Sequence, residues 1–571
     1  MNQMTPEFLT KARQAFTTNT GTSLKDVRDR VAALPASIRR RDRLSALDAV
    51  QKLFGRDLRE VPANWLALRT LFKGCSHGTL GVTAKRYANI RSGITLAVSE
   101  FGAGGTALTK RIALAPDWAD MLATLPEQRY GNALRRLAAF CTVVGIGPQN
   151  VTAEVLLGFH EALVAELMVQ DPRKILKHTI AHWNMALARV KSWPAYKLAS
   201  PFPSSRYMLE PGDFPASFQR DLADWRRRLL KPDPLDDDGP VVALRPITVD
   251  GEEKLLRRFA SVLVLTGSKK AEEITSLSVL LEIDQFKQGL RHFLERAGGK
   301  PTGYVRKYAW LLLSVARHHT KLPKEQIETI RKVVGKLGHR ELGMTDRNRD
   351  KLTQFDEHEN VLKLLNFPME ERKRGLRAKN VYRRAKCFER AAAAAILIYA
   401  SVRMQNLHTI QLEKNLRVSR GTTILSFEKT EMKTGRSLEL ELPEEVADLL
   451  NEYIRHHRPV LPGSDGPYLF PGKNGGPRSH NTMRQDFEHA MFKHTGLKVN
   501  PHLMRHATAM LAINADPANL PMISQRLGHS NMNTARQFYM GNESRPSSRV
   551  MNDILKEALA KPARPKPRKK Q

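Results

Sequence analysis

The chain has 571 residues, and 41% of them are apolar, which is enough to build several buried cores and excludes a wholly disordered chain. At about 150 residues per domain, this length favours about four domains. Lysine and arginine outnumber aspartate and glutamate by 92 to 58, a formal net charge of +34. That charge is far above the magnitude of ~2–8 that suits a small soluble domain, and it indicates a polyanionic partner, most commonly a nucleic acid.

The sequence carries three cysteines, Cys75, Cys141 and Cys387, which are far apart and odd in number. They exclude a disulfide framework and a cysteine-rich zinc site. The first residues lack the apolar core of a secretory signal, and the longest apolar stretch, Ala391 to Val402, is shorter than the ~20 residues that span a bilayer. We expect a soluble, cytoplasmic protein with no membrane partner.

Before residue 420, apolar residues recur at helical spacing, and two stretches look like copies of one helical unit. Leu134 and Leu256 each begin a Leu-Arg-Arg motif, which is followed 17 or 18 residues later by a Val-Thr or Ile-Thr pair (Val151 and Ile274). Residues 85–101 resemble the last helix of these units, which hints at a third copy. Either internal duplication or generic helical patterning explains the similarity.

Segments rich in proline separate these units, and another seam lies near residues 343–356. We expect an N-terminal helical region at residues 1–120, a helical unit with a Pro-rich linker at 121–230, a helical domain at 245–342, a further domain at 346–560 and a tail at 561–571. The tail is basic and interrupted by proline, so it can lie along phosphate.

The character of the sequence changes after residue 380. Residues 371–390 are strongly basic and run directly into the apolar stretch, which predicts one helix that begins against phosphate or solvent and ends in a core. Residues 421–443 alternate apolar and polar on either side of a polar turn, which predicts a β-hairpin with Lys433 on a tight turn. The fold class is therefore mainly α with one small antiparallel β-sheet, in a chain of several domains.

One segment with the chemistry of a phosphate receptor begins at Asn500. Asn500 is a good N-cap, and Pro501 suits the first position of a helix. His502 and Arg505 are three residues apart, so they share a face near the positive end of the helix dipole. Such a pair can bind phosphate oxygens, although a His-x-x-Arg motif is by itself most often a solvated helix face.

Further candidate groups flank this segment. Leu527-Gly528 predicts the end of a helix, and His529 follows directly. Tyr539 lies ten residues after His529. By default, such a tyrosine is an amphipathic core residue whose hydroxyl contacts water. Upstream, Arg403 follows an apolar helix, so we expect it to be partly desolvated and to need an anion. Lys433 can bring a point charge into the same site.

These groups resemble, in order and spacing, the catalytic set of the tyrosine recombinases, the phage-integrase family: Arg403, Lys433, His502, Arg505, His529 and Tyr539. The resemblance is strong over residues 346–545 and weaker over 245–342, which looks like the helical core-binding domain of that family. One position departs from the pattern, because Asn406 stands where the family usually has an acidic residue. Residues 1–230 resemble the family only as further helical DNA-contacting units.

The resemblance implies a site-specific recombinase or integrase, with a role in a mobile element favoured by the long N-terminal region. Tyr539 would be the nucleophile of a covalent 3′-phosphotyrosyl intermediate, and Arg403, Arg505 and His502 would bind the phosphate. Lys433 would protonate the leaving 5′ oxygen, and His529 would assist. No metal, ATP or other cofactor is implied. The partners would be double-stranded DNA with a specific target site, three further protomers in a tetramer on two DNA sites, and sister recombinases or accessory proteins, at the nucleoid.

Three other functions stay open from the sequence. A type IB topoisomerase-like DNA relaxer shares the tyrosine chemistry but needs no second DNA. A non-catalytic architectural protein of the same fold would bind DNA without cutting it. An RNA-binding helical-repeat protein would explain the repeats and the charge, but not the ordered set of six groups.

Overall fold

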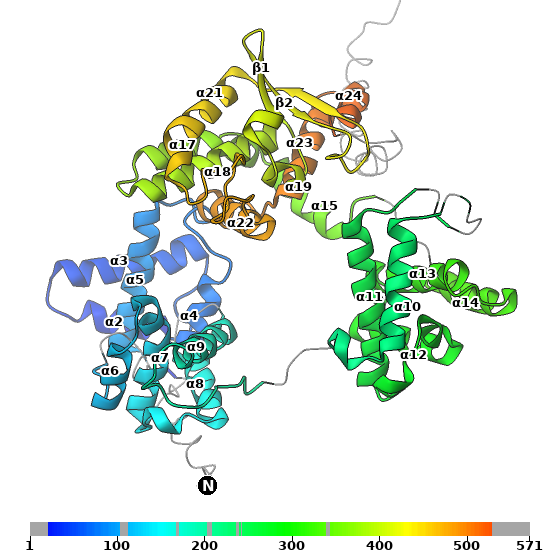
Figure 1. The fold of residues 1–571 in the computed structure, drawn as a ribbon. Coiled ribbons are helices and arrows are strands. Elements are labelled where there is room, and N and C mark those ends of the chain that lie inside the picture. Colours follow the sequence, from blue (N-terminus) through cyan, green and yellow to red (C-terminus); the bar gives the residue numbers. More distant parts are fainter. Residues whose placement is uncertain are drawn as a thin grey trace, which may run out of the picture. The chain divides into compact units, whose positions relative to one another are not determined.

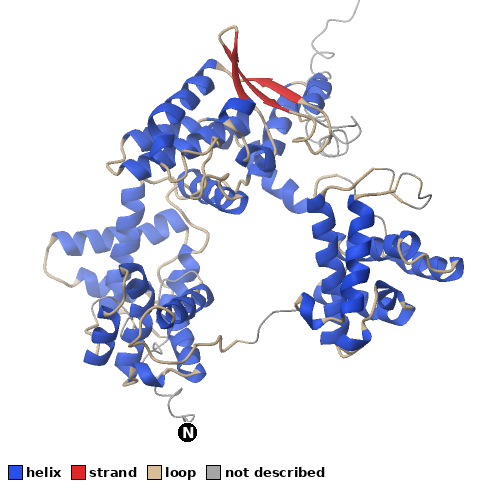
Figure 2. Ribbon diagram, in the orientation of Figure 1, coloured by secondary structure: helices blue, strands red, loops and turns tan. Residues whose placement is uncertain are grey.

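A computed structural model describes residues 21–102, 112–166, 171–202, 208–233, 235, 239–240, 242–338 and 343–527. The described chain is mainly helical and carries one three-stranded antiparallel sheet, as the sequence predicted (Figures 1 and 2). It divides into two compact units, one formed by residues 1–201 with 343–571 and the other by 202–342. None of the described helices is both long enough and apolar enough to cross a bilayer.

The first described helices are four that share one core. They are α2 (Leu24–Ala32), α3 (Ile38–Phe54), α4 (Trp65–Phe72) and α5 (Ala84–Phe101). Each is preceded by a serine, asparagine or threonine whose side chain accepts a hydrogen bond from the first turn. Helices α3 and α5 approach closely at Gly93, where an added Cβ would lie 2.6 Å from the Cβ of Ala46.

A second helical group follows, and two tryptophans lie at its centre. Its elements are α6 (Pro116–Ala123), α7 (Gln128–Val144), the 3-10 turn η1 (Pro148–Asn150), α8 (Ala153–Glu166) and α9 (Pro172–Leu187). Trp118 and Trp183 are fully buried, with ring centroids 6.3 Å apart. The Trp118 indole N–H donates a hydrogen bond of 2.7 Å to the carbonyl of Ile146, which ties α6 to the loop after α7.

The unit of residues 202–342 is a separate helical domain. Its elements are η2 (Pro211–Asp213), α10 (Ala216–Leu230), α11 (Pro246–Leu265), η3 (Ala271–Glu273), η4 (Leu277–Leu281), α12 (Ile283–Arg296), α13 (Gly303–His318) and α14 (Lys324–Lys336). Phe218 and Trp225 of α10 belong to its core. The domain therefore includes α10, which lies before the range 245–342 that the sequence suggested, because α10 buries its aromatic residues on α11.

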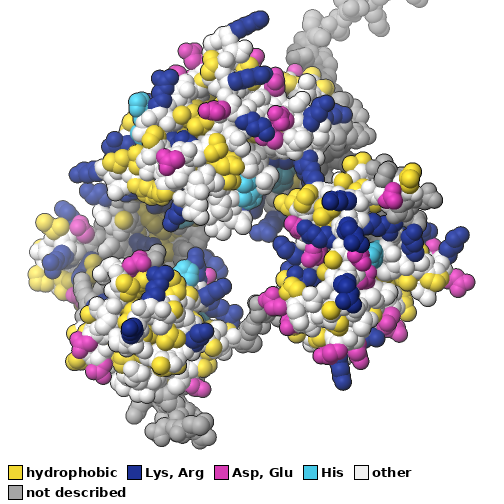
Figure 3. Space-filling model, in the orientation of Figure 1, with side chains coloured by type: hydrophobic (Ala, Val, Ile, Leu, Met, Phe, Trp, Pro, Cys, Tyr) yellow, Lys and Arg dark blue, Asp and Glu magenta, His cyan; other side chains and the backbone are white. Residues whose placement is uncertain are grey.

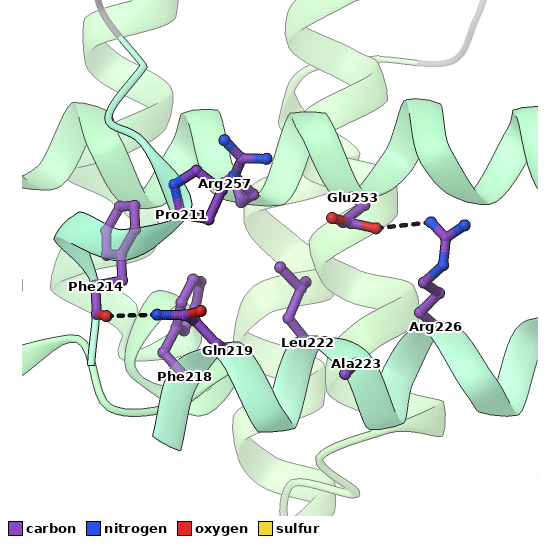
Figure 4. Close-up of a pocket in the computed structure, with 9 residues that line it drawn as sticks. All are labelled: Pro211, Phe214, Phe218, Gln219, Leu222, Ala223, Arg226, Glu253 and Arg257. Atoms are coloured by element: carbon purple, nitrogen blue, oxygen red, sulfur yellow. Dashed lines mark hydrogen bonds and ion pairs between the residues drawn. The ribbon is translucent and has the colours of Figure 1, made fainter. Parts of the chain in front are cut away.

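A small pocket of about 170 Å³ opens between α10 and α11 (Figure 4). Phe214, Phe218 and Leu222 form its apolar part, and the ion pair of Arg226 with Glu253, 2.8 Å apart, closes one end. Pro211, Gln219 and Ala223 of its lining are exposed, so the pocket is a surface hollow above the core residues Phe214, Phe218 and Leu222.

The last described part, residues 343–527, holds the sheet. Its elements are α15 (Asp346–Leu352), η5 (Thr353–Asp356), α16 (His358–Leu365), α17 (Phe367–Leu376), α18 (Val381–Tyr399), α19 (Met404–His408), α20 (Leu412–Asn415), β1 (Leu416–Ser419), β2 (Thr422–Phe427), β3 (Leu438–Glu441), α21 (Glu444–Glu452), η6 (Tyr453–His457), η7 (Arg458–Val460), α22 (His480–Thr495), α23 (Pro501–Ala515), η8 (Pro517–Asn519) and α24 (Leu520–Arg526). Helix α18 runs through the middle of the core and is buried along most of its length.

The prediction of one long helix from residue 371 is wrong. Helix α17 ends at Leu376, and α18 starts at Val381 after the N-cap Asn380, whose side chain accepts a hydrogen bond from Arg383 N–H. The two helices pack tightly, because a Cβ at Gly375 would lie 2.7 Å from the ring of Phe388.

Some arginines in and near residues 371–390 form ion pairs with buried carboxylates. Glu371 is fully buried, and it is paired with Arg374 at 3.0 Å and with Arg390 at 2.8 Å. Glu389, which is 1% exposed, is paired with Arg478 at 2.7 Å. These arginines balance buried carboxylates, so they do not form a single phosphate-binding face.

The predicted hairpin is confirmed as β2 and β3, with Leu425 opposite Leu440 and Phe427 opposite Leu438. Strand β1, which the sequence did not predict, pairs antiparallel with β2. It was missed because it is short and mostly exposed, so it has little apolar alternation.

Candidate active site

Arg403 is placed by the end of the buried helix α18. The chain leaves α18 through Ser401, which has a left-handed backbone (φ +49°), and Arg403 then caps the N-terminus of α19. The Ser401 hydroxyl lies 2.9 Å from the hydroxyl of Thr508 on α23. This contact holds the turn before Arg403 against the helix that carries the next candidates.

The Arg403 guanidinium has the environment that the sequence predicted. Burial lowers its pKa, and its Nη1 atom is buried with no hydrogen-bond partner among the described residues. A buried cation without a partner costs free energy unless an anion reaches it. Arg403 is therefore suited to receive a phosphate oxygen.

Helix α23 starts as predicted. The Asn500 side chain accepts a hydrogen bond of 2.7 Å from Leu503 N–H, and Pro501 occupies the first turn. His502 follows in that turn and is exposed, whereas Arg505, one turn later, is only 5% exposed. The two residues thus differ in role, because Arg505 is held inside the protein and His502 reaches the surface.

Arg505 joins three parts of the site. Its Nη1 donates a hydrogen bond of 2.5 Å to the carbonyl of Ser401, and its Nη2 donates to the carbonyl of Leu527, directly after α24. Both carbonyls follow or end helices, where such groups need partners. The guanidinium is thereby fixed next to the turn that presents Arg403.

Three other candidates act electrostatically on His502. Its pKa lies below its ordinary value, first because protein atoms shield the ring from water and then because the positive charges of Arg505, Arg403 and Lys433 act on it. Its Nε2 lies 3.1 Å from Nε2 of His506. The imidazole is therefore neutral near pH 7 and can exchange a proton.

Lys433 lies in the loop between β2 and β3, residues 428–437, and is exposed. The prediction of a tight turn is wrong, since this loop contains two successive turns. Glu431 N–H donates to the Glu428 carbonyl at 3.1 Å, and Gly435 N–H donates to the Met432 carbonyl at 3.1 Å. Gly435 has a φ of +67°, which explains a glycine at that position.

Several neighbours of the site were not found from the sequence. His506 could have been, because it is four residues from His502 and so shares its helix face. Ser401 and Glu431 act through backbone geometry and long-range contacts, for which the sequence carries no periodic signal. Asn406 was noted only as a departure, but it is 4% exposed and donates a hydrogen bond to the Glu431 carbonyl.

Two candidates, His529 and Tyr539, lie outside the described residues, as does Gly528 of the predicted helix end. The described chain stops at Leu527, whose carbonyl is bound to Arg505. His529 is therefore two residues beyond a fixed point of the site. The segment 545–559 and the basic tail also lie outside the described residues.

The sequence of this part of the chain matches a known family. Residues 357–545 match the model of the phage integrase family. The match takes in all six candidate residues, from Arg403 to Tyr539.

Individual proteins are also similar to parts of the chain. The tyrosine recombinase XerD of Pseudomonas aeruginosa is 32% identical over 103 residues, which are 17% of this chain and 33% of that protein. The match thus spans about a third of that relative's length. Solved structures similar to the chain include the XerH site-specific recombinase bound to difH substrate, with 14% identity over 53% of this chain and 80% of that one and a TM-score of 0.34. A lambda integrase dimer bound to a COC′ core site is 13% identical over 65% and 88% of the two chains, with a TM-score of 0.33.

Proposed function

We propose that the protein is a site-specific DNA recombinase or integrase, which cuts and rejoins DNA strands through a covalent 3′-phosphotyrosyl intermediate. The observation that carries this proposal is that the charges of Arg505, Arg403 and Lys433 all act on the His502 ring, within a segment that matches the phage integrase family model. Attack on a phosphodiester builds negative charge on the non-bridging oxygens, and fixed cations stabilise that charge.

In the proposed reaction, the Tyr539 oxygen attacks the scissile phosphorus, so that a P–O bond to tyrosine forms while the bond to the 5′ oxygen breaks. The tyrosine proton passes to His529 or to water, and the Lys433 ammonium gives a proton to the leaving 5′ oxygen. Rejoining reverses these steps with a 5′ hydroxyl as the nucleophile. The phosphoryl bond energy is kept in the tyrosyl ester, so no ATP is consumed.

The two arginines would share the phosphate. Arg403 offers its buried Nη1 to a non-bridging oxygen, while Arg505 holds the backbone before Arg403 and adds positive charge. Neutral His502 can donate its ring N–H to the second oxygen. Because a guanidinium N–H and a ring N–H donate in fixed directions, this set favours the crowded transition state over the ground-state diester.

DNA binding would come from helical modules before the catalytic domain, and two of these share one plan. Leu134 of α7 and Leu256 of α11 each lie eleven residues before a glycine with φ +73°, Gly145 and Gly267. In both, the N–H after the glycine returns to the same helical carbonyl, from Ile146 to Cys141 at 2.8 Å and from Ser268 to Leu263 at 2.9 Å. One 3-10 turn (η1) and the helices α8 and α9 follow in the first module. Two 3-10 turns (η3 and η4) and the helices α12 and α13 follow in the second, which continues with α14.

The buried positions of the two modules also match. With α7 set against α11, the buried pairs are Leu134 and Leu256, Leu137 and Phe259, Ala138 and Ala260, and Cys141 and Leu263. With α9 set against α13, they are Leu176 and Val305, Thr179 and Tyr308, Trp183 and Leu312, and Ala186 and Val315. Matching helix ends and matching cores favour duplication over generic patterning, so we assign residues 112–202 as a second copy of the core-binding module.

Contacts to phosphate would use the exposed lysines of these modules. Basic side chains are spread over both units in the view of Figure 3. Lys177 of α9 and Lys307 of α13 are exposed, on helices that contain no acidic residue. Changing either lysine to alanine is expected to reduce the slope of log affinity for DNA against log salt concentration by about 0.9, the value for one phosphate contact. An unchanged slope for Lys177→Ala would contradict a DNA role for the first module.

We further propose that four protomers assemble on two DNA sites, in the cytoplasm at the nucleoid. Sister recombinases or accessory proteins would be further partners. The biological setting would be a mobile element. The segment after Tyr539 would dock on a neighbouring protomer. Deleting residues 545–571 should leave DNA binding largely intact and weaken the pairing of two sites, measured as slower-migrating complexes in native gels. Unchanged recombination by this truncated protein would contradict the docking.

The decisive experiment is covalent capture. The protein and its Tyr539→Phe variant are incubated with fragmented source DNA, and protein-linked DNA is recovered under denaturing conditions and sequenced. Capture by the wild type alone at a narrow set of ends would support the recombinase and reveal its target. Scattered capture that the variant loses would favour a topoisomerase-like relaxer, and salt-sensitive DNA binding without capture would favour an architectural protein.

A further inference from the structure

The loop that carries Lys433 is closed by a carboxylate next to it. Glu431 Oε2 accepts a hydrogen bond of 2.9 Å from Glu428 N–H, while Glu431 N–H donates to the Glu428 carbonyl at 3.1 Å. These two bonds form a closed ring at the start of the loop. Met432, which is 3% exposed, then anchors the chain in the core directly before Lys433.

The same carboxylate is held from the other side by the helix that precedes β1. Asn415 Nδ2 lies 3.3 and 3.4 Å from the two Glu431 oxygens and donates to the Ser426 carbonyl at 2.9 Å. Lys414 Nζ lies 3.3 Å from Glu431 Oε1. Asn415 is 1% exposed, so the carboxylate is joined to a fixed part of the domain rather than to a mobile surface group.

A third contact joins the loop to the phosphate-binding arginine. Asn406 lies three residues after Arg403, in the short helix that Arg403 caps, and its Nδ2 donates to the Glu431 carbonyl at 3.1 Å. Since an amide carries a donor and an ionised carboxylate does not, only the asparagine can make this bond near neutral pH. The departure from the acidic residue that is usual in the family therefore has a structural partner in this chain.

We infer that Glu431 is a positioning residue, which with Asn406 fixes the backbone of the Lys433 loop relative to Arg403 so that the Lys433 ammonium reaches the leaving 5′ oxygen. The inference rests on the proposed role of Lys433 as the acid. The Lys433 side chain is exposed and flexible, so its position is set chiefly by its backbone. Proton transfer depends steeply on that position, and a displacement of about 1 Å can cost about 100-fold in rate.

The test compares two leaving groups on full-length protein. Duplexes of the sequence recovered by covalent capture are made with the natural 5′ oxygen, or with a bridging sulfur in its place, at the scissile phosphate. A thiolate leaves without help from an acid, because its conjugate thiol is far more acidic than an alcohol. The rates of strand cleavage are measured for the wild type, Glu431→Gln and Lys433→Ala.

Glu431→Gln keeps the shape of the side chain but loses the charge that binds Asn415 and Lys414. We expect it to cleave the oxygen substrate about 10- to 100-fold more slowly than the wild type and the sulfur substrate at nearly the wild-type rate. The matched control is Glu439→Gln, which removes an exposed carboxylate from β3 of the same sheet and should change neither rate. Equal slowing of both substrates by Glu431→Gln, or no slowing, would overturn the inference.

The outcome for Lys433→Ala separates this inference from the proposed function. If sulfur does not rescue Lys433→Ala, the acid role of Lys433 is wrong. If sulfur rescues Lys433→Ala but not Glu431→Gln, only the positioning role is wrong. Hydrogen exchange without DNA gives an independent readout: the amides of residues 428–437 should exchange faster in Glu431→Gln than in Glu439→Gln, and equal exchange would overturn the role of the carboxylate.

Discussion

Arg505 donates a hydrogen bond of 2.5 Å to the backbone carbonyl of Ser401, two residues before Arg403. The two arginines of the proposed phosphate site are therefore linked through the main chain and not through a shared acidic side chain. Arg505 stabilises the fold through its hydrogen bonds, whereas Arg403 has a buried nitrogen with no hydrogen-bond partner in the described chain. This division predicts opposite effects of the two residues on stability.

Arg505→Ala should destabilise the part of the protein formed by residues 343–527, and Arg403→Ala should not. The first change leaves the carbonyls of Ser401 and Leu527 without their charged donor, which is expected to cost roughly 3 kcal/mol. The second removes a cation whose burial lowers its pKa, so the free energy of unfolding should stay equal or rise. Both variants should lose DNA cleavage. Urea unfolding checks the difference, with exposed Arg417→Ala as the control, and an equal loss of stability in both variants would refute it.

The lowered pKa of His502 predicts how the cleavage rate falls at acid pH. Its folded pKa is lowered from 6.5 because neighbouring protein atoms shield the ring from water and three cations act on it, so the folded protein binds fewer protons than the unfolded chain. Stability from this group is thus fully present above pH 6.5 and falls as the pH drops below that value toward the folded pKa. If the reaction needs neutral His502, the cleavage rate should decline as the pH is lowered, with an apparent pKa below 6.5. His502→Gln should be slow and should lack that decline, whereas a decline centred above 6.5 would assign it to another group.

The helical unit of residues 202–342 offers a test of domain independence. A Cβ at Gly289 on α12 would lie 2.3 Å from the ring of Phe259 on α11. Gly289→Ala must therefore push the helices apart, which is expected to cost about 1–3 kcal/mol in this domain. Scanning calorimetry should show one transition at lower temperature and the catalytic transition unchanged. Gly251→Ala on α11, where an added Cβ meets nothing, is the control.

The parts of the site that were predictable from the sequence are those coded locally. Asn500 and Pro501 set the start of α23 by capping, and the apolar run of α18 predicts the desolvation of Arg403. The long-range contacts were not predictable, because nothing in the sequence pairs Arg505 with Ser401. The same limit applies to the helix predicted from residue 371, since the charges of Glu371 and Arg390 gave no sign that they would pair inside the fold.

Asn406 gives the sharpest prediction, because its change to the acidic residue usual in the family should be harmful here. An aspartate at this buried position would place a carboxylate against the Glu431 carbonyl, with the Glu431 side chain close by. The loss of one buried hydrogen bond and the added repulsion should slow cleavage about 10- to 100-fold near pH 8.

The defect of Asn406→Asp should also depend on pH in a definite direction. Burial and the neighbouring oxygens raise the pKa of the new carboxyl above its ordinary value near 3.9, and its protonated form can again donate a hydrogen bond to the Glu431 carbonyl. The cleavage rate relative to the wild type should therefore rise as the pH is lowered from 8 to 6. Asn406→Ala lacks any donor, so its relative rate should stay constant over that range. If the aspartate and alanine variants follow the same pH course, the Asn406 amide does not hold the Lys433 loop.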